Sequence, residues 1–142
     1  MNMMLPDLQA SMLCDDVRQE RNGKFILIGI FDGLAHPSNH PICARLCIIN
    51  RWCMGGGEFK QKSRIMAPDG KTIVAEGQLV PIKLNSDQQV ATTVEVFMNL
   101  AFHQEGVHWV EILLEGKLRM RYPLHVRKLP PVQHPQQPPP EA

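Results

Sequence analysis

The sequence predicts an all-β domain, an antiparallel immunoglobulin-like β-sandwich, followed by a proline-rich C-terminal tail. Two observations support this fold class. Apolar residues recur mainly with a period of two, which is typical of strands with one buried face. Turn-forming segments also separate short apolar runs at regular intervals, as in sandwiches and barrels. These segments are Asn22-Gly23, Gly55-Gly56-Gly57, Pro68-Asp69-Gly70, Asn85-Ser86-Asp87 and Glu115-Gly116.

The composition is that of an ordinary globular protein. A chain of 142 residues is long enough for one domain with a single core and a tail. Hydrophobic residues make up 44% of the chain and charged residues 20%, which excludes a disordered protein. The formal net charge is +1, so no field of the whole molecule attracts nucleic acid or an anionic membrane.

The N-terminal residues and the cysteines indicate a cytoplasmic protein. Residues 1–7 lack the basic and apolar regions of a signal peptide. No segment approaches the roughly 18 consecutive apolar residues of a membrane-spanning helix. Thiols stay reduced in the cytosol, so we expect no disulfide. The cysteines concerned are Cys14, Cys43, Cys47 and Cys53.

Two apolar segments carry the strand prediction. Residues 24–31 are short and almost continuously apolar, so we expect a central strand covered on both sides. Gly29 and the β-branched residues around it disfavour a helix there. Residues 90–102 alternate, and their even positions are apolar apart from Thr92. This alternation predicts that Val96 lies in the core.

The triple glycine at residues 55–57 predicts a hairpin between residues 42–52 and 58–66. In the register that separates two faces, Arg51 lies opposite Lys60, and a shift of one residue would mix the faces. One face, expected in the core, then carries Ile42, Ala44, Leu46, Ile48, Trp52, Phe59 and Ile65. The other, basic face carries Arg45, Arg51, Lys60, Lys62 and Arg64.

A second hairpin is predicted around a three-residue loop at Glu115-Gly116-Lys117. This loop pairs Leu114 with Leu118, Ile112 with Met120, Val110 with Tyr122 and, on the outer face, Glu111 with Arg121. A two-residue Glu-Gly turn would instead set Ile112 against Arg119 and mix apolar with charged positions. We therefore favour the longer loop.

The composition changes near the C-terminus. Residues 129–140 are rich in proline and have no pattern of core positions, which is typical of an extended polyproline segment. We therefore divide the chain into a β-sandwich domain at residues 1–128 and a flexible proline-rich tail at residues 129–142.

Four segments form a pattern that spans most of the chain. They are Cys14-Asp15-Asp16-Val17-Arg18, Asn22-Gly23-Lys24, Pro68-Asp69-Gly70-Lys71, and residues 106–112 running into Glu115-Gly116-Lys117. Over residues 8–127 the pattern resembles an uncharacterised family of small bacterial proteins. The resemblance implies a domain of unknown function with an immunoglobulin-like sandwich, and it implies no activity. Sandwich domains often place an aromatic residue where this chain has His108, so we expect a buried or half-buried histidine.

The strongest metal-site candidate is the segment of residues 32–43. Two histidines, a carboxylate and a thiol fall within it, and a loop can converge such ligands. The ligands would be Asp32, His36, His40 and Cys43. Their spacing matches no common zinc signature, and the prolines also suit a plain connector. Cys43 and Cys47 cannot share one zinc ion on a strand, because they would lie about 13 Å apart.

Two other charged groups are candidate sites. The basic face of Arg45, Arg51, Lys60, Lys62 and Arg64 could bind phosphates, or it could be a solvated strand face that blocks edge-to-edge pairing. Asp15 and Asp16 are adjacent, so on a strand they point to opposite faces and cannot share a proton. We expect one of the two to be solvated and the other to cap a turn or pair with Arg18 or Arg21.

The sequence contains none of the common catalytic motifs. It has no Gly-x-Ser-x-Gly, no phosphate-binding Gly-x-x-x-x-Gly-Lys and no His-Glu-x-x-His. We therefore predict a protein that is not an enzyme and uses no cofactor: an interaction or accessory module. Its partner is expected to be another protein or a second copy of the chain, with no membrane involved and nucleic acid disfavoured. Two alternatives stay open: a metal-binding protein that uses residues 32–43, and an anion or nucleic-acid binder that uses the basic face.

Overall fold

The computed structural model describes residues 4–131, which contain ten β-strands and no helix. The all-β prediction is therefore confirmed for this part of the chain. The strands are β1 (Asp7–Gln19), β2 (Phe25–Phe31), β3 (Gly33–Pro37), β4 (Ile42–Cys53), β5 (Gly57–Met66), β6 (Ile73–Glu76), β7 (Val80–Leu84), β8 (Val90–Ala101), β9 (Gly106–Leu114) and β10 (Lys117–Leu129).

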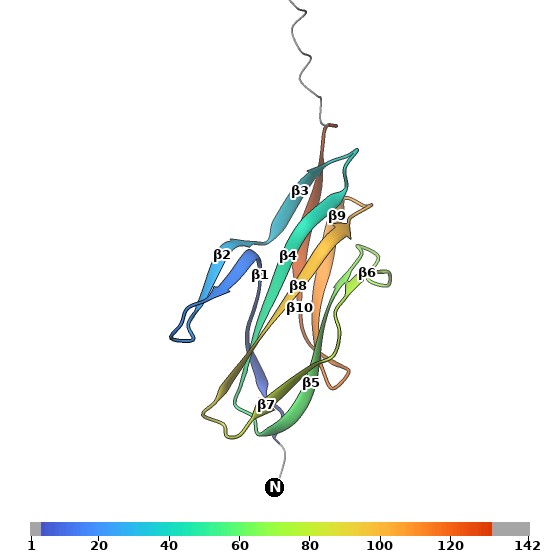
Figure 1. Cartoon of the computed structure of the whole chain (residues 1–142). Helices are drawn as coiled ribbons and strands as arrows, with labels where there is room; N and C mark the ends of the chain where they lie inside the picture. Colours follow the sequence, from blue (N-terminus) through green and yellow to red (C-terminus); the bar gives the residue numbers. More distant parts are fainter. Residues whose placement is uncertain (1–3, 132–142) are drawn as a thin grey trace, which may run out of the picture.

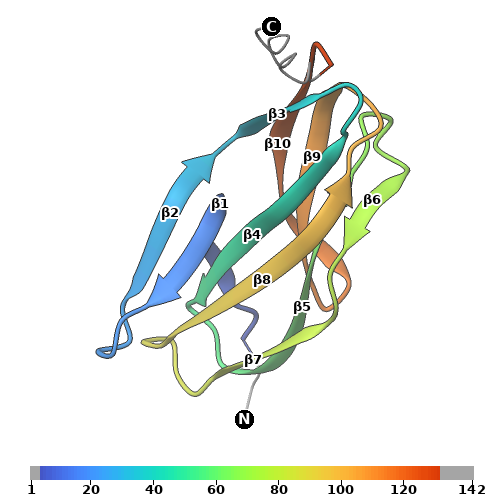
Figure 2. The same cartoon turned by 45° about the horizontal axis from the view of Figure 1, so that its top comes forward.

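The strands form two sheets that enclose a common core (Figures 1 and 2). The first sheet has the order β2-β1-β4-β8, and all its pairs are antiparallel. The second has the order β3-β10-β9-β5-β6, and β7 also pairs with β5. β3 runs parallel to β10, so the second sheet is mixed. The chain enters it at β3 directly from β2, which belongs to the first sheet.

Alternate residues of each strand fill the core, as the period of two predicts. Trp52 is fully buried, which confirms its predicted place in the core. Val96 is 47% exposed, so the prediction that it is buried is wrong. β8 instead turns its odd-numbered residues Thr93, Glu95 and Phe97 inward. Thr93 can face the interior because its hydroxyl donates a hydrogen bond of 3.1 Å to the buried Gln61.

The predicted hairpin around the triple glycine is wrong. β4 pairs with β1 and β8, whereas β5 pairs with β6, β7 and β9 in the other sheet. The glycines therefore carry the chain from one sheet to the other. Gly55 needs to be glycine because a Cβ there would lie 2.7 Å from Pro6. Five residues of the predicted core face, Leu46, Ile48, Trp52, Phe59 and Ile65, are buried as expected. The prediction is wrong for Ile42 and Ala44, which are exposed.

The final hairpin combines the two alternatives that the sequence offers. The turn has two residues, Glu115 and Gly116, with φ of 50° and 76°, a left-handed pair typical of tight hairpins. A β-bulge between Leu118 and Met120 then restores the predicted pairing. The pairs Ile112–Met120, Glu111–Arg121 and Val110–Tyr122 are therefore confirmed, while Leu114 pairs with Lys117 rather than Leu118.

The strand ladder extends past the predicted end of the domain at residue 128. β10 includes Leu129, whose carbonyl accepts a hydrogen bond of 3.0 Å from the Ser38 amide. Of the predicted tail, residues 129–131 are described and residues 132–142 lie outside the described residues. The predicted central strand at residues 24–31 is instead an edge strand, β2, because only β1 pairs with it.

β1 and β2 form a two-stranded arm at one side of the first sheet (Figures 1 and 2). β1 pairs with β4 only as far as Cys14, but its pairing with β2 continues to Gln19. At the point of separation Gly29 has φ +68°, and a Cβ there would overlap the carboxylate of Asp15. Only glycine therefore lets the arm bend at this point.

Candidate functional site

The four residues predicted to bind a metal do not converge. Residues 33–37 are a strand rather than a loop, so they cannot fold back to bring ligands together. His36 is buried, and its Nδ1 lies 3.1 Å from the Pro37 carbonyl oxygen. Cys43 packs against the core from β4, while Asp32 and His40 are exposed. Across residues 4–131, no group of three or more His, Cys, Asp or Glu side chains could hold a metal ion.

The five residues of the predicted basic face lie on two different sheets. Arg45 and Arg51 project from β4 in the first sheet, while Lys60, Lys62 and Arg64 project from β5 in the second. Three of them form ion pairs: Arg45 with Asp16 at 2.9 Å, Lys62 with Glu76 at 2.8 Å and Arg64 with Glu111 at 2.8 Å. The structure therefore does not bring the five cations together on one surface.

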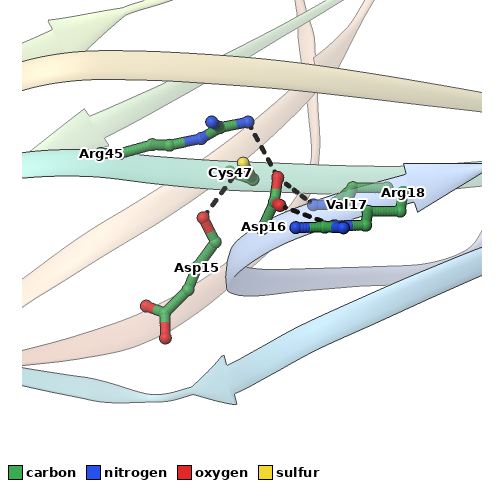
Figure 3. Close-up of polar contacts among 6 residues, drawn as sticks. All are labelled: Asp15, Asp16, Val17, Arg18, Arg45 and Cys47. Atoms are coloured by element: carbon green, nitrogen blue, oxygen red, sulfur yellow. Dashed lines mark hydrogen bonds and ion pairs between the residues drawn. The ribbon is translucent and has the colours of Figure 1, made fainter.

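Asp15 and Asp16 have separate surroundings, as expected for neighbours on a strand (Figure 3). The Asp15 side chain is directed away from Asp16 and is exposed. Asp16 pairs with Arg18 at 3.3 Å, one of the predicted partners, and also with Arg45 on β4. Since β1 has already left the β4 ladder here, this second ion pair ties the base of the arm to β4.

Two cysteines lie next to this ion pair. Cys14 on β1 and Cys47 on β4 are opposite each other in the ladder, and both are fully buried and unoxidised. Burial raises the pKa of the Cys14 thiol to about 11, and the neighbouring Cys47 adds to this rise. The Cys47 thiol donates to the Asp15 carbonyl at 3.7 Å, and Cys47 and Asp16 both raise the pKa of Arg45 (Figure 3). These cysteines are therefore packing residues, and Arg45 stays charged.

The register of the first sheet defines three rows of side chains that face away from the core. They are Ile30–Cys14–Cys47–Val96, Ile28–Asp16–Arg45–Met98 and Met12–Ile49–Val94. We call these residues the outer face. Its middle is buried or ion-paired, whereas its two flanks on β2 and β8 expose large apolar side chains. Exposed apolar clusters of this kind mark interaction surfaces more often than scattered single residues do.

β8 is the flank with the longest free edge. It has 12 residues, and β4 pairs with one side of it only. Across residues 4–131, no backbone hydrogen bond reaches its other side. Its outer-face residues Val94, Val96 and Met98 are exposed, while its single charged residue, Glu95, is buried. Sequence reasoning missed this surface because it assigned the apolar even positions to the core.

The sequence matches one protein family over most of its length. A model of a family of unknown function, DUF6941, matches residues 9–127. The chain therefore belongs to this family, and the resemblance inferred from the Cys14-to-Lys117 pattern is confirmed at the level of an uncharacterised family. No curated protein sequence matches the chain.

Solved structures include distant likenesses to this fold. One is the alkylpurine DNA glycosylase AlkC of Pseudomonas fluorescens, solved bound to DNA containing an abasic site analogue. The TM-score is 0.54 and the sequence identity is 10%, so the likeness concerns the fold alone. The match covers 87% of this chain but only 31% of the glycosylase.

Within residues 4–131, no helix is long and apolar enough to cross a membrane.

Proposed function

We propose that this chain is a non-enzymatic assembly module that joins a second copy of itself along the free edge of β8. The observation that carries the proposal is the long, unpaired and uncharged edge of β8 beside the exposed apolar flank of the outer face. A free edge presents a row of backbone donors and acceptors that another strand can pair with. Adding a strand in this way is a recurrent mode of protein recognition.

The other edges of the two sheets carry features that oppose pairing. β3 and β7 have five residues each and contain Pro37 and Pro81, which cannot donate to a ladder. β6 has four residues. β2 is interrupted by the left-handed Gly29. β8 has none of these protections over its first nine residues, before the left-handed Asn99.

The sequence of β8 suits pairing with an identical strand. Two copies related by a twofold axis pair antiparallel, and a register centred on Val96 sets Val94 against Met98 of the second copy. Every outer-face contact in this register is apolar. Glu95 faces the core, so the twofold axis brings no like charges together. The joined sheets would form one continuous sheet of eight strands.

The metal-binding and anion-binding alternatives have less support. A metal site needs ligands that the strand β3 keeps apart, and an anion or nucleic-acid site needs cations that lie on two sheets. The DNA in the similar structure is bound by that glycosylase, of which this chain matches less than a third. An immunoglobulin-like classification and a cytoplasmic location are part of our proposal. Four free cysteines are compatible with a reducing compartment.

The mass of the full chain in solution tests the proposal. Analytical ultracentrifugation over a concentration series should give twice the chain mass at the upper end. Val96→Lys should give a monomer over the same series, because the twofold axis places two lysines opposite each other. Its fold should survive, since the side chain of Val96 is largely exposed.

Ile28→Lys is the matched control, because Ile28 is 42% exposed on β2 at the other edge of the sheet. This variant should remain a dimer. A wild-type monomer at every concentration, or a dimer that Val96→Lys leaves intact, overturns the proposal. Dissociation by Ile28→Lys alone would also overturn it, since the arm rather than β8 would then hold the copies together.

A further inference from the structure

A cleft of about 470 Å³ opens where β6 of the second sheet faces the end of β8 in the first. Both strands are sheet edges, so no ladder closes this seam. Ile73, Val74 and Leu100 give the cleft apolar walls. Its volume falls in the range of roughly 300–1,000 Å³ that is typical of small-molecule sites.

His108 brings a polar side chain into the lining of this cleft. The residue is 1% exposed on β9, and its ring packs edge-on against Phe102 with 5.2 Å between centroids. Its Nδ1 lies 3.3 Å from the carbonyl oxygen of Gly106 and therefore donates to it. Burial lowers the pKa of His108, so the ring is neutral at neutral pH and Nε2 carries a lone pair.

The backbone of β8 is distorted at the cleft. Asn99 has φ 55°, a left-handed conformation that asparagine adopts more readily than most residues other than glycine. Met98 before it faces outward, whereas Leu100 after it faces the core and lines the cleft. At Asn99 the side chains of β8 therefore change sides, so that Leu100 points toward the core and forms an apolar wall of the cleft. Strained backbone of this kind concentrates at binding sites.

The charge of the lining limits what the cleft can hold. Its polar side chains are those of Thr72, Asn99, His103, Gln104 and His108. No Asp, Glu, Lys or Arg is among the described residues that line it. An ionised ligand would therefore lose its hydration without gaining a counter-charge. An uncharged ligand with an apolar body meets no such cost.

We propose that this cleft binds an uncharged, largely apolar small molecule that donates one N–H or O–H hydrogen bond to Nε2 of His108. The apolar walls hold the body of the ligand, and the histidine selects for the donor. This site does not depend on pairing along β8, because it rests on His108 and on the seam between the sheets.

Indole and 1-methylindole are suitable probes, because they share one apolar body and only indole has an N–H donor. Titration of the full wild-type chain, followed by two-dimensional NMR, should shift the amide signals of Leu100 and His108 and leave that of Val96 unchanged. Indole should bind about tenfold more tightly than 1-methylindole, the effect of one buried hydrogen bond. This comparison needs no variant, so it stands even where a variant fails to fold.

Two variants test whether His108 causes the tighter binding of indole. His108→Phe keeps a ring against Phe102 but removes Nε2, so the two probes should bind this variant equally. His103→Phe is the matched control, because His103 also lines the cleft but is exposed, and it should retain the tenfold preference. Equal affinities for the wild type, shifts at the outer face instead of the cleft, or no binding of either probe would each overturn the proposal.

Discussion

Trp52 and Gln61 join the two sheets through the core: the indole Nε1 of Trp52 donates a hydrogen bond of 3.2 Å to Oε1 of Gln61. Asn50 and Thr93 donate to the same oxygen at 2.9 and 3.1 Å. All three donors belong to the first sheet, and the acceptor belongs to β5 of the second. One buried amide therefore satisfies three donors and fixes how the sheets face each other.

Gln61→Leu should destabilise the protein strongly. The substitution keeps a side chain of similar size but removes the acceptor that three buried donors share. Asn50 keeps a second acceptor, Ser63 Oγ at 2.9 Å, whereas Trp52 and Thr93 lose the acceptor described above. An unsatisfied buried donor costs about 1–3 kcal/mol, so the free energy of unfolding should fall by about 2 kcal/mol or more. Urea denaturation followed by tryptophan fluorescence measures this loss.

Gln78→Leu makes the same chemical change at an exposed position between β6 and β7. Its free energy of unfolding should stay within about 0.5 kcal/mol of the wild type. A loss at residue 61 no larger than this would show that the shared acceptor does not hold the sheets together.

The alternation of apolar residues predicts which side chains share a face, but it does not predict which strands pair. Leu46, Ile48 and Phe59 were expected on one inner face, and all three are buried. The predicted pairing of β4 with β5 was wrong because a glycine-rich connection suits both a hairpin and a crossing between sheets. Only long-range packing, such as the contact between Trp52 and Gln61, decides between them.

The exposed apolar flank of the outer face on β8 could not be predicted from the alternation of apolar residues, for a related reason. Thr93 and Glu95 are polar, so the rule that polar residues face solvent placed Val96 in the core. The interior contains a polar cluster around Gln61, and its existence cannot be read from one strand. Beyond its turn, the register of the final hairpin was predictable, because it sets Glu111 against Arg121, and these side chains do lie 3.6 Å apart. His108 was expected to be buried, and it is.

Two alanine substitutions should separate the core from the outer face. Trp52→Ala removes a fully buried indole and should cost about 3–5 kcal/mol of unfolding free energy. Val96→Ala removes a half-exposed side chain from the outer face and should cost about 0.5 kcal/mol or less, measured at concentrations at which the chain is a monomer. Thermal and urea denaturation measure both. A larger loss at Val96 than at Trp52 would reverse the assignment of the two faces.

The cysteines should differ in their reactivity. The thiols can be counted with an aromatic disulfide reagent that releases a coloured thiolate. In denaturant without reductant, this reagent should detect four thiols, since all four cysteines are free. In the native protein Cys14 should react slowly, because it is fully buried and its pKa is raised to about 11, which leaves little thiolate. Cys53, which is half-buried, should react first, and Cys43 should follow, because burial also raises the pKa of its thiol.

Cys14→Ala serves as the control for this reactivity. It should leave the fast phase of the native reaction unchanged and remove one thiol from the total in denaturant. A smaller fast phase in this variant would mean that Cys14 is accessible, in conflict with its burial in the middle of the outer face.

Glu95→Gln should stabilise the protein at neutral and alkaline pH. Burial raises the pKa of Glu95 above its ordinary value of 4.5, against a smaller opposing effect of Ser63 and Gln61. Neither carboxyl oxygen makes a hydrogen bond of good geometry within residues 4–131, although these two side chains lie nearby. Gly77 closes over the group, since a Cβ there would lie 2.7 Å from Oε1 of Glu95.

The sign of the pH dependence follows from this raised pKa. The folded state holds the proton of Glu95 to higher pH than the unfolded state, so stability falls as pH rises from about 4.5 through the folded pKa. Glutamine does not ionise and avoids this loss. Urea denaturation near pH 8 should therefore find Glu95→Gln more stable than the wild type, and the difference should shrink toward about pH 4.5.

Glu76→Gln should show the opposite behaviour and is the matched control. Glu76 is exposed, and its hydrogen bond with Lys62 lowers its pKa below 4.5. Its contribution to stability is present above pH 4.5 and is lost as the pH falls through the lowered pKa. Glu76→Gln should thus be slightly less stable than the wild type at neutral pH and equal to it in acid. If Glu95→Gln followed the same course, the Glu95 carboxylate would have to be charged and paired within the folded core.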